Sequence, residues 1–366
     1  MKISTVNGYL ESLAPLTYQE DFDNAGLITG DPDHELSGIL VCLDVTPEVM
    51  EEAIRKQCNL VISHHPFIFH SLKKLLPDDP VTTILTRAIQ TDTAIYACHT
   101  NLDNILEGLN AHVIKGMGVA DYKVLRPVTS KLTKLVTFCP AEHAEAVRDT
   151  LFRAGAGHIG NYDQCSFNVA GNGTFRAYGK TNPFIGTLDQ QHQEPEIRIE
   201  VILENHIKNK VVEALLASHP YEEAAYDLYP LSNTFAKAGS GLIGQLQEPV
   251  EETQFLEKVK ELLKIPCIRH SGWRNKTIQK IALCTGSGSF LIPDAMKAEA
   301  DIFLTADLKY HDFFVPSGQM MVADIGHYES EVGVKEWLHA TLIEKFPTFA
   351  VFISETNTNP VHYFNR

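Results

Sequence analysis

Short apolar runs and longer amphipathic segments alternate from the start of the chain to about Lys123. The apolar runs predict strands, and the segments between them, with apolar residues at helical spacing, predict helices. The expected strands are residues 38–45, 59–66 and 93–100, and the expected helices are 47–57, 81–90 and 106–117. Alternation of this kind predicts βαβ units and a mostly parallel sheet.

The same alternation returns near the end of the chain, over residues 277–355. The two ends therefore predict an α/β fold in which two open halves, residues 1–125 and 233–366, form one body. Residues Thr234 to Gly244 are rich in small side chains, and we expect them to be a linker that returns to the second half.

Residues 126–232 have a different pattern and predict an inserted domain. Expected strands at 134–140, 165–171 and 196–204 are combined with amphipathic helices at 141–155 and 207–220. The order strand, helix, strand, repeated twice, is typical of a ferredoxin-like α+β domain.

Composition adds a few limits to this picture. With 366 residues, 44% apolar and 21% charged, the chain is expected to be globular and to have two or three domains. Its formal charge of −15 disfavours binding to nucleic acid or to anionic membranes. The start resembles no signal peptide, no stretch is long and apolar enough to span a bilayer, and the seven cysteines form no CxxC pair, so we expect a cytoplasmic protein with reduced thiols.

Two adjacent histidines, His64 and His65, follow the expected strand that ends near Ser63. In open α/β sheets, ligands bind outside the carboxyl ends of the strands, so the position points to a site. The alternative is that one ring packs and the other is solvated, and the pair alone does not decide between them.

The next expected strand ends in His99, Asn101 and Asp103, at the same edge of the sheet. The two oxygens of Asp103 could bridge two cations, as carboxylates do in paired-metal sites. An aspartate in this position also commonly caps a helix, and the two roles are compatible.

His327 and Glu331 are four residues apart at the opening of a long expected helix, so their side chains share one face. Such a pair can bind one metal ion, although an exposed His and Glu in a first helical turn is an equally ordinary arrangement. Glu329 faces elsewhere. Together, His64, His65, Asp103, His327 and Glu331 predict a site for two divalent cations, with nitrogen and oxygen ligands that suit Zn²⁺, Mn²⁺, Fe²⁺ or Co²⁺.

Other features are less specific. The turn Thr285–Phe290 has the geometry of an anion site but is more often an ordinary strand-to-helix turn, unless it opens onto the metals. Lys309 and His311 offer a cation and a proton carrier, or a helix-surface pair. Asp23 and Asp44 could orient histidines, or could be caps.

The motifs SHHP, HTNLD, LKYH and GHYESE, in this order, resemble the Nif-three-like dinuclear-metal family, whose members are often labelled GTP cyclohydrolase type-two homologues. The resemblance implies the same five metal ligands and a toroidal homohexamer. Among the four metals we expect zinc first. Two further motifs, GNYDQCSF with GNGTFR and HPYEEAAYDLYPL, look like the inserted PII/CutA-like domain of the family's longer bacterial members.

We favour the hypothesis of a metal-dependent hydrolase that acts on a nucleotide or a phosphorylated small molecule, with His99, His311 or Glu329 moving protons and Lys309 neutralising a phosphate. The competing hypothesis is a regulatory or metal-handling protein in which the insert is a sensor. A nucleic-acid platform is a third and weaker alternative, because the net charge opposes it.

Overall fold

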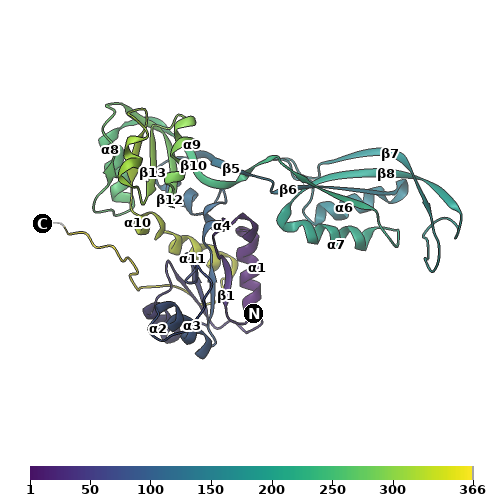
Figure 1. The fold of residues 1–366 in the computed structure, drawn as a ribbon, viewed down its shortest axis with the longest axis horizontal. Coiled ribbons are helices and arrows are strands. Elements are labelled where there is room, and N and C mark those ends of the chain that lie inside the picture. Colours follow the sequence, from purple (N-terminus) through teal and green to yellow (C-terminus); the bar gives the residue numbers. More distant parts are fainter. Residues whose placement is uncertain (365–366) are drawn as a thin grey trace. The chain divides into compact units, whose positions relative to one another are not determined.

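The computed structural model describes residues 1–364, which form two compact units (Figure 1). The larger unit combines Met1–Pro127 with the residues from Ala236 onward, and the smaller one is Val128–Phe235, called the insert below. These limits lie two and three residues beyond the expected limits of 126 and 232.

The first sheet of the larger unit has the strand order β1-β4-β3-β2-β15. Its strands are Gly26–Thr29 (β1), Ile39–Cys42 (β2), Leu60–Ser63 (β3), Ala94–Ala97 (β4) and Val351–Ile353 (β15). Only β1 is antiparallel to its neighbour. Every residue of β2, β3 and β4 is buried, which explains why these strands are continuous apolar runs rather than alternating ones.

Helices cover both faces of this sheet. On one face, α2 (Pro47–Arg55) and α3 (Pro80–Gln90) share a core with β2 and β3, and on the other lie α1 (Ile3–Leu13) and α11 (Val334–Lys345). The side chains of Thr46 and Asp79 accept hydrogen bonds from backbone N–H groups at the starts of α2 and α3, each followed by a proline. These caps fix where both helices begin.

The second sheet has the order β11-β14-β13-β12-β10-β5. Its strands are Asp121–Thr129 (β5), Thr234–Glu251 (β10), Arg269–His270 (β11), Thr277–Ser287 (β12), Ile302–Ala306 (β13) and Met321–Asp324 (β14). The three central strands β12, β13 and β14 are parallel, whereas β10 and β11 are antiparallel to their partners. Strands β12 and β13 and helix α9 (Ile292–Lys297) are labelled in the same part of Figure 1. The other helices of the unit are α4 (Thr100–Asp103), α5 (Leu109–Gly116), α8 (Glu252–Leu262) and α10 (His327–Glu331).

The prediction of a linker at Thr234 to Gly244 was wrong, because these residues belong to β10. Its glycines are needed for close backbone packing rather than for flexibility. A Cβ on Gly239 would lie 2.1 Å from the carbonyl oxygen of Arg126, and Gly239 has a φ of +148°. Leu242 and Ile243, which follow, are buried.

The two sheets do not divide as the two ends of the chain do. Strand β15, near the C-terminus, pairs with β2 in the first sheet, and β5, from the first half, is an edge of the second. Each of the two sheets of the larger unit therefore contains strands from both halves of the chain. No helix among residues 1–364 has both the length and the apolar character needed to cross a membrane.

The insert has the elements β6 (Leu132–Pro140), α6 (Ala144–Arg153), β7 (Ser166–Arg176), β8 (Gln191–Glu204), α7 (Lys208–Ser218) and β9 (Tyr226–Leu231). Its antiparallel sheet has the order β7-β8-β6-β9, and both helices share one core with it. This is the ferredoxin-like arrangement that the sequence predicts.

One buried carboxylate fastens the last strand to the body. Glu52, on α2 and only 1% exposed, accepts hydrogen bonds from the hydroxyls of Ser354 and Thr356 and from the backbone of Glu355, and it pairs with Lys56. Burial opposes its ionisation, but these donors outweigh burial and lower the pKa of Glu52 to about 2.

We expect Glu52→Gln to lower the free energy of unfolding at pH 7 by roughly 1–3 kcal/mol, because a neutral amide replaces a charged acceptor. A depressed pKa stabilises the fold fully above the ordinary carboxyl value and loses that contribution as the pH falls towards about 2. Denaturant unfolding should therefore show a smaller gap between wild type and variant near pH 2.5 than at pH 7. Glu51→Gln, on the exposed face of the same helix, is the control, and an unchanged gap would contradict the assignment.

Candidate metal centre

Three strand ends of the larger unit meet at one cluster of side chains. His64 and His65 follow β3, His99 and Asp103 follow β4, and α10, which carries His327 and Glu331, follows β14. The structure brings all five expected ligands together. His64 Nε2 lies 3.7 Å from Asp103 Oδ1 and 3.9 Å from Glu331 Oε1, and Glu331 Oε2 lies 3.0 Å from His65 Nε2 and 3.1 Å from His327 Nε2.

Each of these histidines is held by its Nδ1 atom. His64 Nδ1 is 2.7 Å from the carbonyl oxygen of Cys98, His65 Nδ1 is 2.7 Å from Asp44 Oδ1, and His327 Nδ1 is 2.7 Å from Asp307 Oδ2. Because the partner of each Nδ1 is an oxygen acceptor, Nδ1 carries the proton and donates. The Nε2 atoms of all three rings thus face the cluster, in the orientation that metal-ligating histidines take.

Among residues 1–364, three buried polar atoms of the cluster find no hydrogen-bond partner: His64 Nε2, Asp103 Oδ1 and Glu331 Oε2. The contacts of Glu331 Oε2 with two histidines are short, but neither has the alignment of a hydrogen bond. Buried polar atoms are rarely left without partners in folded proteins. Their convergence makes the cluster a candidate site for a cation.

The protonation of the cluster shows how strongly its charges interact. Burial lowers the pKa of His64 to about 3, so this ring is neutral. Burial also acts against charged His65 and His327, but the carboxylates beside them outweigh it and raise the pKa of His65 to about 10 and that of His327 to about 9. Burial and the neighbouring charge of Glu331 raise the pKa of Asp103. Protons on His65 and His327 thus balance the negative charge of the carboxylates beside them. A bound divalent cation would balance that charge in their place.

Potential ligand atoms form two groups that share one residue. His64, His65 and His99 make one group, and His65, His327 and Glu331 make the other, with all candidate atoms of each group within 4.8 Å of one another. Asp103, one of the five expected ligands, belongs to neither group, whereas His99, expected to move protons, belongs to the first. The shared His65 makes the two groups neighbours.

The expected turn Thr285–Phe290 begins within β12, whose last residues are Thr285 to Ser287, and its Gly286 lies against the cluster. A Cβ on Gly286 would lie 2.1 Å from Glu331 Oε1 and 3.5 Å from His327 Nε2, and Gly286 has a φ of +61°. Its N–H donates to Ser330 Oγ, which itself donates to the carbonyl oxygen of His327. The turn therefore positions α10, and its N–H at Gly286 is not available to an anion.

The residues expected to move protons lie in different places. The ring of His99 packs edge-on against those of His64 and His65, and its Nδ1 is 2.7 Å from Asp23 Oδ1. Glu329 borders a cavity of about 690 Å³ beside His65 and His327, and accepts a hydrogen bond from Asn359. His311, next to Lys309, is exposed on the 3₁₀ helix Tyr310–Phe314 and contacts Tyr310 and Phe314 rather than the cluster.

Sequence reasoning missed Asp307 and Arg269. Asp307 orients His327, and the signal was available, since an aspartate directly follows a buried strand at the same sheet edge. Arg269 borders the cavity beside His327 and pairs with Asp324. It comes from a strand of two residues, which no periodic pattern reveals.

The chain is similar to known proteins over almost all of its length. The sequence profile of the Duf34/NIF3 family (NGG1p interacting factor 3) matches residues 1–360. Proteins named GTP cyclohydrolase 1 type 2 homolog are 39% identical in Halalkalibacterium halodurans, covering 98% of this chain and 99% of the relative, and 36% identical in Bacillus subtilis, covering 96% and 95%. The crystal structure of a Bacillus cereus protein related to NIF3 superposes with a TM-score of 0.86 at 35% identity, covering 100% of this chain and 99% of that one.

We expect Gly286→Ala to destabilise the protein more than Gly318→Ala. Both glycines have a positive φ, which costs an alanine about 1 kcal/mol, but Gly318 has open space around it, whereas a methyl group at Gly286 meets Glu331. Denaturant unfolding of both variants measures the difference. Equal losses of stability would show that Gly286 is needed for its backbone conformation alone.

Proposed function

Since the chain belongs to the Duf34/NIF3 family, we propose that it binds two divalent metal ions and hydrolyses a nucleotide or a phosphorylated small molecule with their help. The observation that supports the proposal is the convergence in one cluster of three buried atoms, on His64, Asp103 and Glu331, that form no hydrogen bond with any described residue.

The residues present fit a pair of cations better than one. The five expected ligands supply three imidazole nitrogens and two carboxylates, and Glu331 can offer one oxygen towards His64 and the other towards His65 and His327. Mixed nitrogen and oxygen donors suit Zn²⁺ first, with Mn²⁺, Fe²⁺ and Co²⁺ as alternatives. Asp44, Asp307 and the carbonyl of Cys98 hold the rings in the orientation that binding needs.

Paired cations in such sites lower the pKa of water and stabilise the negative charge that develops during hydrolysis. The cavity beside His65 and His327 gives a substrate access to the cluster. Arg269, which also pairs with Asp324, and Glu329 both border this cavity, and in this proposal Arg269 neutralises a phosphate and Glu329 accepts a proton. His99, oriented by Asp23, is the proton carrier closest to His64 and His65.

GTP is the first substrate to test, because the curated relatives are named as homologues of a GTP cyclohydrolase. The alternative is a regulatory or metal-handling protein in which the cations are structural or cargo. The toroidal homohexamer that the family resemblance implies stays a prediction.

We expect purified protein saturated with Zn²⁺ to hold close to two metal ions per chain, measured by mass spectrometry after gel filtration. Glu331→Gln should reduce this content most, because Glu331 touches both groups. Asp44→Asn leaves every ligand in place and should weaken metal binding about 10- to 100-fold through the loss of orientation of His65. His34→Ala, a histidine outside the cluster, is the control. Wild-type protein without metal would contradict the proposal.

We expect the zinc-loaded protein to release product from GTP or from at least one member of a panel of nucleotides and phosphoesters. His64→Ala should reduce turnover to background, and His99→Gln should reduce it while metal content is retained. Full metal content without turnover on the whole panel would favour the regulatory alternative. Turnover that persists after the metal is removed would contradict the metal-dependent mechanism.

A further inference from the structure

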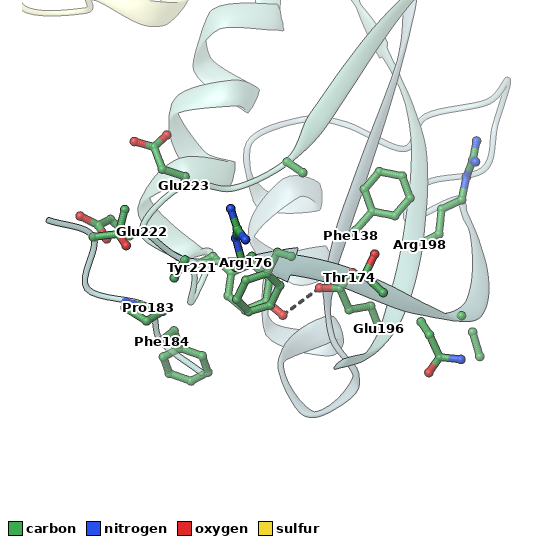
Figure 2. A pocket seen from close by; sticks show the side chains of 18 of the residues that line it. Phe138, Thr174, Arg176, Pro183, Phe184, Glu196, Arg198, Tyr221, Glu222 and Glu223 are labelled. Atoms are coloured by element: carbon green, nitrogen blue, oxygen red, sulfur yellow. Dashed lines mark hydrogen bonds between the residues drawn. The ribbon is translucent and has the colours of Figure 1, made fainter. Parts of the chain in front are cut away.

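The insert contains a cavity of its own, with a volume of about 580 Å³. It lies where strands β7 and β8 meet the segment that follows α7, and every residue that borders it belongs to the insert (Figure 2). Its size is that of an ordinary small-molecule site. None of the residues of the candidate metal centre borders it.

Aromatic rings form much of its wall. The ring centroids of Phe175 and Tyr221 are 5.9 Å apart, those of Phe184 and Tyr221 are 6.3 Å apart, and Phe138 borders the cavity as well. Phe184 is 51% exposed although it is a large apolar side chain. Rings arranged in this way suit a flat apolar group and can also attract a cation to their faces.

A buried carboxylate faces the same space. Glu196 is 9% exposed, and the hydroxyl of Tyr221 donates a hydrogen bond of 2.8 Å to its Oε1 atom (Figure 2). Oε2 has no hydrogen-bond donor among residues 1–364, and a Cβ on Gly173 would lie 2.1 Å from it. The glycine thus makes room for the carboxylate, which has one oxygen left to accept a hydrogen bond.

His219 holds Tyr221 in place. The N–H of Tyr221 donates to His219 Nδ1 at 3.1 Å, and His219 Nε2 donates to the carbonyl oxygen of Phe138 at 2.9 Å. Burial lowers the pKa of His219, which keeps this ring neutral. Burial, together with the hydrogen bond to Glu196, raises the pKa of Tyr221, so its hydroxyl remains a donor. Glu196 is therefore held in a preformed position.

The cavity also has a positive group without a partner. Arg176, at the end of β7, borders it and forms no ion pair with any described residue. Arg198, in contrast, pairs with Glu200 at 2.9 Å and lies over the ring of Phe138. Arg176 is thus available to a ligand's carboxylate.

We propose that this cavity binds a free amino acid with an aromatic side chain. The ring would pack among Phe175, Phe184 and Tyr221, the ammonium group would donate to Glu196, and the carboxylate would pair with Arg176. Glu222 and Glu223 also border the cavity, so its charged groups are three carboxylates and two guanidiniums. This balance favours a zwitterion over a polyanion such as a nucleotide.

The test is calorimetric titration of the full-length protein with L-tryptophan, L-phenylalanine and L-tyrosine, alongside two analogues of tryptophan. Tryptamine lacks the carboxylate and indole-3-propionate lacks the ammonium group. We expect at least one amino acid to bind, and Arg176→Ala to weaken its binding about tenfold or more while leaving tryptamine unaffected. Glu196→Gln should weaken the amino acid and tryptamine, but not indole-3-propionate.

Matched variants make the result specific to this cavity. Arg153→Ala removes an exposed arginine of the insert that does not border the cavity, and binding should be unchanged. Phe184→Ala removes a half-exposed ring, so it should reduce affinity without loss of folding, which thermal unfolding checks for every variant.

Three results would overturn the proposal. The first is no binding of any of the three amino acids at millimolar concentration. The second is binding that Arg176→Ala, Glu196→Gln and Phe184→Ala all leave unchanged. The third is binding that persists in Arg176→Ala but is lost in His64→Ala, which would place the ligand at the metal centre. Since no variant of the insert alters a metal ligand, failure here leaves the proposed hydrolase untouched.

Discussion

The carboxylate of Glu331 is 3% exposed, and a charge buried to this degree needs opposite charges close by. In this protein the compensation comes from His65 and His327, whose rings approach one of its oxygens, while His64 lies near the other. Removal of any one partner leaves a buried carboxylate poorly compensated. Much of the surrounding structure serves to hold this arrangement.

The need to hold and compensate the buried charge of Glu331 explains several features around it. Gly286 has no side chain because Glu331 occupies the space, and Ser330 fastens α10 to Gly286 at the end of β12. Asp44 and Asp307 hold two of the histidines from strand ends on different sheets. Since both sheets contribute residues, the cluster exists only when the whole larger unit has folded.

The sequence predicted those parts of the site that lie close together along the chain. Residues that are close in sequence stay close in the fold. This holds for the adjacent histidines after a buried strand and for the His/Glu pair one helical turn apart. The position of Asp307 after a buried strand was a visible signal, but its partner His327 lies 20 residues away and no local pattern joins the two. The glycine-rich start of β10 was mistaken for a linker, because composition alone does not distinguish flexibility from close packing.

The insert shows the same limit in another form. His219 and Tyr221 lie two residues apart, and the hydrogen bond between them is local in sequence. What the pattern could not reveal is the partner across the sheet, because Glu196 lies 25 residues away from Tyr221 in sequence. The absence of a side chain at Gly173 is explained only by the Glu196 carboxylate, which fills the space beside it.

The position of β15 affects how the chain can be made. This strand pairs with β2, although more than 300 residues separate them, so β2 has an unpaired edge while the intervening chain is being synthesised. An exposed strand edge is a template for association with other chains. During translation, the first sheet can be completed only after residue 353 has left the ribosome, and until then the edge of β2 stays open.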